Sequence, residues 1–290
     1  MAAYPGTGAP RLLDDLAARK EFRTAASDSP RDAEGIAGYG MSYRASVEGY
    51  PIQKALTMHG LQLTGAQTFV RNFENPNTAF SRLLIEWQTG TGKSIAAAAI
   101  AQEFIRTFRA RTALGEETPS VFVISFTARE TIQEDMMRHP EFGFSSHAEV
   151  AELHRLRAAA AMNGALSTEA KQLSSLLGVL RRRLTDRARG GYYQFYGYKE
   201  FANRLLTVTA KGLAAGFDVL ELYGRGGTSV EDDFGEALSR ETAKGHVRVN
   251  EELLAELRGG LLIADEIHEV YNVQETNNYG IAIQYALDAL

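Results

Sequence analysis

Apolar residues in this chain gather in short runs separated by polar and glycine-rich segments. The runs at 82–86, 121–125 and 259–264 are each bounded by polar or turn-forming residues, so each predicts a buried strand. Two further stretches predict helices: 95–107, which is rich in alanine, and 128–138, which is stopped by Pro140. Strands that alternate with helices indicate an α/β domain with a mostly parallel sheet.

The segments outside these elements predict the domain organisation. Residues 1–55 are rich in Ala, Gly, Asp and Ser without a sustained period, and we expect an N-terminal extension that is partly disordered or packs late. The domain itself is assigned to 56–290. Two or three strand–helix units of ~30 residues do not fill the 172 positions from Lys93 to Asp265. We therefore expect a mainly helical insertion at about 140–255.

The first apolar run enters a glycine-spaced loop, Thr89-Gly90-Thr91-Gly92-Lys93-Ser94, which opens a helix. Glycines at these positions let backbone amides curl around phosphates, and the positive end of the helix dipole adds to the attraction. Lys93 can reach the terminal phosphates, and the Ser94 hydroxyl is placed to bind Mg²⁺. Trp87 stands where the strict pattern has its first glycine, so the turn must begin in extended geometry. The loop predicts a site for a nucleotide, with Thr89 and Thr91 among its binding residues.

The third apolar run delivers Asp265, Glu266 and His268 at its carboxyl end. Ligands bind at this edge of open α/β sheets. Asp265 suits the coordination shell of Mg²⁺, and Glu266 is placed to orient and deprotonate an attacking water. Alone, such a strand end is more often simply solvated. A phosphate loop in the same chain favours the functional interpretation, with Lys93 and Glu266 as catalytic residues.

The loop and the run Asp265-Glu266-Ile267-His268 together resemble motifs I and II of the superfamily two DExH-box helicases and translocases. Residues 121–129 resemble motif Ia, and residues 265–272, 278–283 and, more weakly, 198–203 are similar to helicases of large DNA viruses. Relatives of those helicases include the small subunit of the poxvirus early transcription factor. The resemblance implies a RecA-like P-loop NTPase domain with ATP and Mg²⁺ as ligands. It also implies that Gln67 reads adenine and that His268, counted with the catalytic residues, couples nucleotide state to nucleic acid.

Two parts of the chain are candidates for contact with nucleic acid. Thr127 and Arg129 follow a predicted strand end and can touch a phosphate backbone, although a helix cap and an exposed arginine explain them nearly as well. Lys and Arg exceed Asp and Glu in 151–190, which predicts either a phosphate-contacting surface or a solvated helical hairpin. The aromatic residues at 192–201 favour a buried strand and a first helical turn over a platform for stacking bases.

Composition excludes several other classes of protein. The 290 residues include no cysteine, so disulfides and thiolate zinc sites are excluded, and 44% of them are hydrophobic, enough for a large core. No apolar run approaches the roughly 18 residues that cross a bilayer, and the N-terminus lacks the apolar core of a signal peptide. We expect a protein that is not secreted, and the resemblance to viral helicases implies the host cytoplasm or the virion as its setting. The net charge of −5 gives no general attraction to nucleic acid.

We interpret the chain as the first RecA-like domain of an ATP-dependent helicase or translocase that acts on DNA or RNA, possibly in viral transcription. Superfamily members carry a Ser-Ala-Thr motif after motif II and a second RecA-like domain with an arginine at the ATP site. Since neither is found here, we expect the front portion of a longer protein, weakly active or inactive without that domain or a partner subunit. The alternatives are a P-loop NTPase of another class and a non-catalytic subunit that binds nucleotide or nucleic acid.

Overall fold

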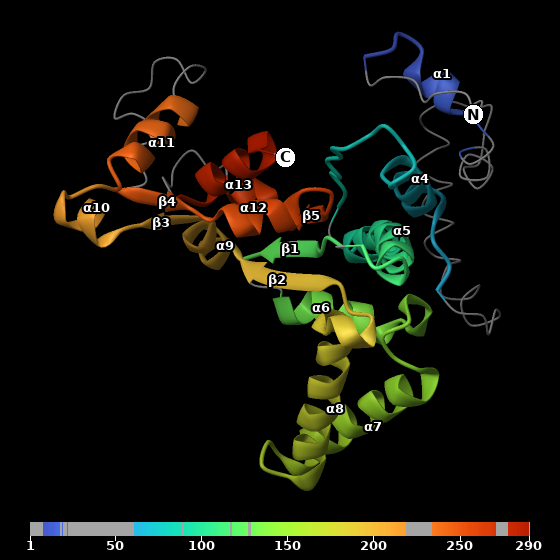
Figure 1. Cartoon of the computed structure of the whole chain (residues 1–290). Coiled ribbons are helices and arrows are strands. Elements are labelled where there is room, and N and C mark those ends of the chain that lie inside the picture. The colour runs from blue at the N-terminus through green and yellow to red at the C-terminus, as the bar shows by residue number, and fades with distance from the viewer. Residues whose placement is uncertain are drawn as a thin grey trace. The chain divides into compact units, whose positions relative to one another are not determined.

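The computed structural model describes residues 8–17, 19, 22, 61–88, 90–116, 118–126, 129–218, 234–270 and 278–289 (Figure 1). The chain divides into two compact units. Unit 1 comprises Met1–Ala110 and Ile132–Arg189, and unit 2 comprises Arg111–Thr131 and Gly190–Leu290.

Unit 2 is built on a parallel sheet of three strands in the order β2-β1-β5 (Figure 1). The central strand β1 (Val121–Ser125) pairs along its whole length with β2 (Tyr193–Gly197), and on its other side with β5 (Leu261–Ala264). All five residues of β1 are buried, as expected for a parallel strand covered on both faces. The strands predicted at 121–125 and 259–264 are confirmed, and the described chain is α/β with a parallel sheet.

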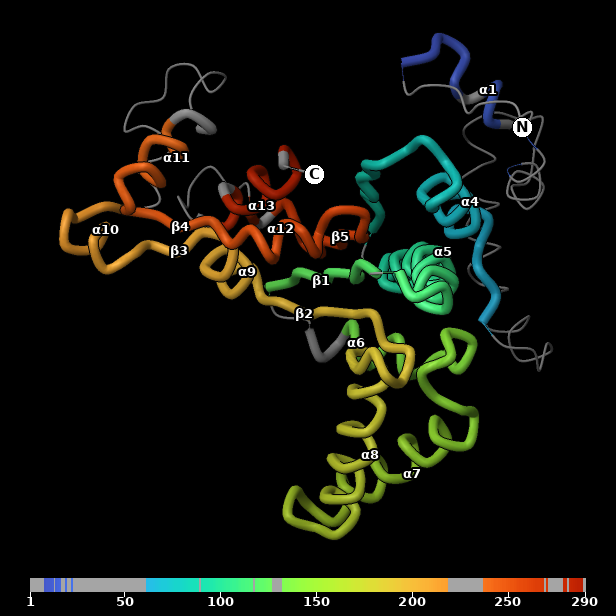
Figure 2. Tube along the Cα trace, viewed as in Figure 1, coloured from blue at the N-terminus to red at the C-terminus, as the bar shows by residue number. Residues whose placement is uncertain are grey.

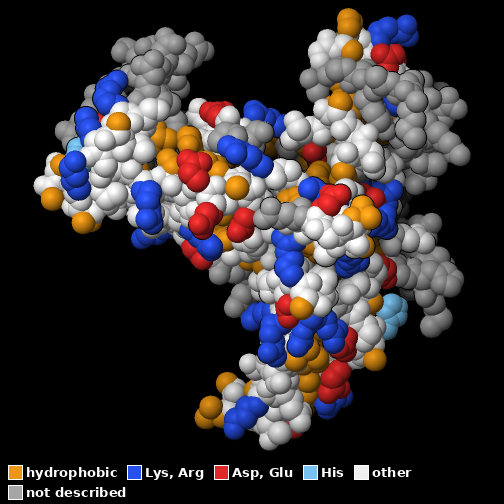
Figure 3. All heavy atoms as spheres, in the orientation of Figure 1, with side chains coloured by type: hydrophobic (Ala, Val, Ile, Leu, Met, Phe, Trp, Pro, Cys, Tyr) orange, Lys and Arg blue, Asp and Glu red, His pale blue; other side chains and the backbone are white. Residues whose placement is uncertain are grey.

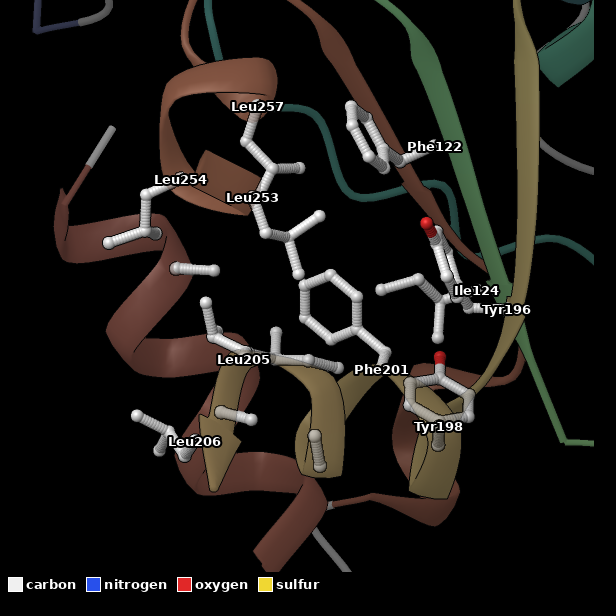
Figure 4. Close-up of a cluster of buried hydrophobic side chains, with 14 of the residues drawn as sticks. Phe122, Ile124, Tyr196, Tyr198, Phe201, Leu205, Leu206, Leu253, Leu254 and Leu257 are labelled. Atoms are coloured by element: carbon white, nitrogen blue, oxygen red, sulfur yellow. The ribbon is translucent and has the colours of Figure 1, made fainter. Parts of the chain in front are cut away.

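One face of this sheet packs on a hydrophobic core centred on Phe201, which is completely buried (Figure 4). Phe201 belongs to α9 (Tyr198–Leu205), which directly follows β2. Leucines from α12 (Glu251–Leu257) and apolar residues from α13 (Asn278–Ala289) complete the core. The aromatic run at 192–201 therefore forms a buried strand and the start of a helix, as predicted, and its buried rings offer no platform for bases.

A second, two-stranded antiparallel sheet extends unit 2 (Figure 2). It pairs β3 (Leu206–Val208) with β4 (Val247–Val249), and α10 (Ala210–Ala214) and α11 (Phe234–Ala243) lie between these strands in the sequence. The Thr209 side chain caps α10, and its hydroxyl also donates a hydrogen bond to the Gly245 carbonyl at 2.6 Å. Gly212 packs so closely that a Cβ there would lie 2.3 Å from the His246 carbonyl oxygen. The turn before β4 is thus fastened to the start of α10.

Unit 1 is helical in its described parts. α1 (Leu12–Ala17), α4 (Gly65–Phe73) and α5 (Lys93–Ala113) come from its N-terminal segment. Leu16, Phe22 and Phe80 form a small buried cluster, with Phe69 and Phe73 of α4 packed against it. The rings of Phe73 and Phe80 are stacked with their centroids 4.0 Å apart. Aromatic packing therefore holds the described part of the N-terminal extension against α4.

The second segment of unit 1 is dominated by a helical hairpin. α6 (Arg129–Arg138) and the short helix η1 (Pro140–Phe142) lead into α7 (His147–Asn163) and α8 (Thr168–Thr185), and η2 (Arg187–Arg189) follows. α7 and α8 lie side by side (Figures 1 and 2). Each begins with a serine cap, because Ser146 and Ser167 accept hydrogen bonds from amides in the first turn. The helix predicted at 128–138 is confirmed, and residues 151–190 form a helical hairpin.

The strand predicted at 82–86 is wrong. Residues 80–88 are neither helix nor strand, and Leu84 is 77% exposed. A strand needs a neighbour that supplies a ladder of hydrogen bonds, and within the described chain no strand pairs with this segment. The apolar pattern is typical of a strand, but no strand of the described chain pairs with this segment.

The domain boundaries stay predictions. The extension assigned to 1–55 lies mostly outside the described residues, as does the start of the domain assigned to 56–290. The range 140–255, assigned to an insertion, contains the hairpin and also β2, which pairs with β1. None of the described helices is both long and apolar enough to cross a membrane.

Glu74 at the end of α4 is a buried carboxylate. It is 7% exposed, and its Oε2 atom has no hydrogen-bond partner among the described residues. Burial disfavours the charged form and raises the pKa of Glu74 from 4.5 to about 7. The folded state therefore holds this proton more tightly than the unfolded state does. Stability from Glu74 is greatest below pH 4.5 and is lost as the pH rises through 7.

Glu74→Gln should consequently stabilise the fold more at high pH than at low pH. We expect its gain in unfolding free energy to be about 2 kcal/mol larger at pH 8 than at pH 5, because glutamine carries no charge to bury. Urea melts at the two pH values measure the difference. Glu86→Gln, at an exposed position, is the matched control. A gain independent of pH would contradict the burial argument.

Candidate functional site

The glycine-spaced loop adopts a conformation that only glycine takes up readily. Gly90 and Gly92 both have φ near +83°, in the left-handed region. Between them, the Thr91 hydroxyl donates a hydrogen bond of 2.7 Å to the Gln88 carbonyl and closes the turn. Thr89 lies outside the described residues. The two glycines therefore allow the tight turn that their spacing in the sequence predicted.

The loop runs directly into the N-terminus of α5. Lys93 is the first residue of this helix, and its first backbone bond runs from the Ala96 amide to the Gly92 carbonyl at 3.0 Å. The amides before Ala96, including those of Lys93 and Ser94, have no acceptor within the helix ladder. Free amides and the positive end of a helix dipole make such a terminus attractive to an anion. The side chains of Lys93 and Ser94 are half-buried at this point.

Gln67 is tied to the loop through its side chain. It is 4% exposed and lies in the first turn of α4, where its Oε1 atom accepts a hydrogen bond from the Thr64 amide at 2.9 Å. Its Nε2 atom donates to the Gly92 carbonyl at 3.2 Å. Both ends of the Gln67 amide are thus used within unit 1, in a capping box and in a support for the loop. Adenine recognition by Gln67 stays a prediction.

The carboxylates of the second candidate group lie in unit 2, at the carboxyl end of β5. The Asp265 amide donates to the Ile124 carbonyl at 2.9 Å, which extends the ladder with β1 by one bond. Asp265 is half-buried, whereas Glu266 and His268 are exposed. Glu266 Oε2 lies 3.4 Å from His268 Nδ1. An exposed pair of this kind contributes little to stability.

The structure brings the predicted site residues together in two groups. Gln67 and the loop residues from Gly90 to Ser94 form the first group in unit 1, and Asp265, Glu266 and His268 form the second in unit 2. Their meeting on one nucleotide stays a prediction. Of the two residues expected to touch nucleic acid, Thr127 lies outside the described residues and Arg129 is the first residue of α6.

Several arginines of the basic stretch, among them Arg155, Arg157, Arg183 and Arg189, pair with acidic side chains. Arg183 donates to both oxygens of Glu149, at 2.8 and 2.9 Å, and Arg155 does the same with Glu152. The hydrogen bond from Arg183 lowers the pKa of Glu149 to about 2. Figure 3 shows basic and acidic side chains intermixed over the hairpin. This favours the solvated hairpin over a continuous surface for phosphates.

Tyr198 and Phe126 belong to the described surroundings of Asp265, and the sequence analysis assigned neither to the site. The Tyr198 hydroxyl donates to the Asp265 carbonyl at 2.7 Å. Phe126, which follows β1 and is 39% exposed, lies with its ring centroid 4.3 Å from that of Tyr198. The aromatic run predicted that Tyr198 is a core residue. The residues next to it in the sequence do not indicate which atom accepts its hydroxyl hydrogen bond.

The donor sets suit ATP with Mg²⁺. Amides at a helix N-terminus and one lysine suit the phosphates, and a hydroxyl and a carboxylate are the oxygen ligands that Mg²⁺ accepts beside phosphate. Glycine at 92 leaves no Cβ at a point where one would lie 2.5 Å from Gln67 Nε2. Ser94 in unit 1 and Asp265 in unit 2 stay predictions as ligands of Mg²⁺.

Gly92→Ala should destabilise the protein more than Gly90→Ala. Both changes place a side chain at φ near +83°, but only the first also brings a Cβ against Gln67. We expect a cost of about 1 kcal/mol for Gly90→Ala and at least about 2 kcal/mol for Gly92→Ala. Urea melts provide the measurement. In a Gln67→Ala background the two costs should converge; equal costs in the unaltered background would show that the contact is unimportant.

Comparison with known proteins gives a consistent set of relatives. The chain is 47% identical over 309 aligned residues, covering 99% of its length, to the early transcription factor large subunit homolog of an African swine fever virus isolate from a pig in Kenya. It is 53% identical over 241 residues, 80% of its length, to the protein of the same name from a tick isolate from Malawi. The chain spans 27% and 22% of these two relatives.

A shorter match reaches a protein named as a helicase. Over 43 residues, 15% of the chain and 4% of the relative, it is 54% identical to a putative ATP-dependent RNA helicase of Acanthamoeba polyphaga mimivirus. No protein-family profile and no solved structure matches the chain. The swine fever virus names refer to a large subunit, whereas the resemblance noted in the sequence was to the small subunit of the poxvirus factor. The chain is thus a homologue of one segment of viral proteins named as large-subunit homologues of an early transcription factor.

Proposed function

We propose that this chain is the ATP-binding RecA-like domain of a helicase-like viral transcription factor, and that it binds and hydrolyses ATP. The observation that carries the proposal is the loop at the start of α5. Two glycines at positive φ precede a helix whose first residue is Lys93, and this is the geometry that a phosphate group requires. The names of the relatives support the viral and transcriptional setting, and the mimivirus match supports the helicase likeness.

Within this function each predicted residue has a stated task. The amides and side chains from Thr89 to Ser94 hold the phosphates, and Gln67 contacts adenine. Ser94 and Asp265 hold Mg²⁺, which neutralises phosphate charge when it is bound. Glu266 orients water and accepts its proton. Positioning and charge neutralisation supply most of the catalysis in phosphoryl transfer. Catalysis therefore depends on how firmly these residues are held in place.

The proposed function also implies partners for this chain. A large subunit implies a partner subunit, and the host cytoplasm or the virion is the setting of such a factor. Thr127 and Arg129 would contact the phosphate backbone of DNA or RNA, and His268 would couple that contact to the nucleotide. A second RecA-like domain would supply an arginine to the ATP site, and we expect very slow turnover without it.

A non-catalytic nucleotide switch is the second candidate. The relatives that cover most of the chain are named as transcription factors, which favours a subunit that binds nucleotide to change its contacts. Stimulation of ATP turnover by DNA or RNA separates the two functions. It would also separate a helicase-like protein from P-loop NTPases of other classes, whose turnover does not depend on nucleic acid.

Lys93→Ala should abolish ATP binding. The change removes the side-chain cation that the loop directs to the terminal phosphates, and charge-assisted bonds to phosphate are among the strongest in such a site. Calorimetric titration with ATP and Mg²⁺ measures the affinity. Lys171→Ala, at an exposed position on α8, is the control and should bind as the unaltered protein does. Equal affinity in Lys93→Ala would refute the proposed function.

Glu266→Gln should separate binding from turnover. In the full-length protein we expect ATP affinity to be kept and turnover to fall by about 10²-fold or more, because glutamine cannot accept the proton of the attacking water. Steady-state ATPase assays with and without nucleic acid measure the effect. Glu252→Gln, at an exposed position on α12, is the control. Undiminished turnover would assign the proton transfer to another residue.

A further inference from the structure

Tyr198 is the first residue of α9 and lies in the core of unit 2, beside Ile124 and Tyr196 (Figure 4). It is 2% exposed, yet its hydroxyl does not end among apolar groups. The hydroxyl donates a hydrogen bond of 2.7 Å to the backbone carbonyl of Asp265, a residue 67 positions further along the chain. A core tyrosine thus reaches the segment that carries the candidate carboxylates.

This hydrogen bond completes the anchoring of Asp265. The Asp265 amide donates to the Ile124 carbonyl on β1 at 2.9 Å, so one side of the residue is held by the sheet. Its carbonyl is held by Tyr198 from the other direction. The Asp265 carbonyl and the Glu266 amide share one planar peptide unit, so the bond from Tyr198 orients the peptide from which Glu266 leaves the strand, while the bond to Ile124 fixes the peptide before it.

Glu266 leaves that peptide in a disfavoured conformation. Its φ of 56° and ψ of 38° place it in the left-handed region, and it is the one residue other than glycine with positive φ in the described part of the chain. Residues with side chains keep such conformations only where their surroundings enforce them. The Tyr198 bond is a constraint of this kind, since it sets the peptide at the start of the turn.

The tyrosine ring is itself fixed. It packs against Phe126 with the ring centroids 4.3 Å apart, and Phe126 continues from the end of β1. Ring and hydroxyl therefore connect the carboxyl ends of β1 and β5 with the start of α9. Removal of the hydroxyl alone would leave the ring packing in place and free the Asp265 carbonyl.

We propose that Tyr198 is a positioning residue that holds the Asp265–Glu266 peptide in its left-handed turn, and so directs the Glu266 carboxylate. The inference rests on the proposed function for its catalytic consequence. Tyr198 is not among the predicted ligands of ATP or Mg²⁺, and it acts through Asp265 and Glu266. It should therefore affect the turnover of bound ATP and not the affinity for ATP.

The test compares Tyr198→Phe with Tyr196→Phe in the full-length protein. Tyr196 is a buried tyrosine of β2 whose hydroxyl donates to Gln194 and accepts from Arg204, away from Asp265. We expect Tyr198→Phe to lower kcat by about tenfold or more, as a displaced catalytic group does, with the Kd for ATP changed less than about twofold. Tyr196→Phe should leave kcat unchanged.

Hydrogen exchange of the backbone at 261–270 supplies the second readout, independent of activity. Tyr198→Phe should speed exchange in this segment, and Tyr196→Phe should not. Faster exchange with unchanged kcat, or slower turnover with unchanged exchange, would overturn the positioning role. If the unaltered protein has no ATP turnover, the proposed function fails along with the catalytic consequence, while the exchange rates still decide whether Tyr198 holds the peptide.

Discussion

The hydrogen-bond ladder on both sides of β1 is the constraint on which the arrangement of unit 2 depends. A strand buried on both faces cannot leave its amides and carbonyls unpaired, so it needs a neighbour on each side. β2 and β5 provide these neighbours in parallel, from segments far apart in the sequence. The register with β5 places Ala264 opposite Ile124, and the Asp265 amide continues the pairing. The carboxylates consequently leave the sheet at one defined point.

The core beneath the sheet fixes the position of α9 relative to the strands that carry the site. Phe122 and Ile124 alternate with residues on the opposite face of β1, and they pack on Phe201 and the leucines of α12. α9 starts directly where β2 ends, so the first residue of the helix lies at the same edge as the carboxylates. Tyr198 uses this position to combine apolar packing of its ring with a hydrogen bond from its hydroxyl, a combination for which buried tyrosine is suited.

Positive φ, which occurs at several turns of the described chain, is also found at the candidate functional positions. Gly90 and Gly92 adopt positive φ in the loop, and Glu266 does so without the freedom of glycine. At each place a hydrogen bond from a distant side chain supports the turn: Gln67 contacts Gly92, and Tyr198 contacts Asp265. Conformations of this kind persist where surrounding contacts determine them, and they are often found where a ligand must be held in one orientation.

Much of this organisation can be read from the sequence alone. Short apolar runs predicted the strands at 121–125 and 259–264. The glycine spacing predicted a turn that opens a helix, which was expected from residue 95 and begins at Lys93. These features are local, since strand periodicity and turn chemistry are properties of neighbouring residues. The run at 82–86 shows the limit of such reasoning. Its composition suits a strand, but a strand exists only when another segment pairs with it.

Only the tertiary structure decided which side chains support the loop and the carboxylates. Gln67 lies 25 positions from Gly92 in the sequence, and Tyr198 lies 67 positions from Asp265. Neither distance leaves a periodic signal, because the contacts arise from how helices and strands pack after they form. The left-handed conformation of Glu266 is of the same origin: its sequence neighbours allow several conformations, and the hydrogen bonds that restrict the Asp265 peptide come from β1 and α9.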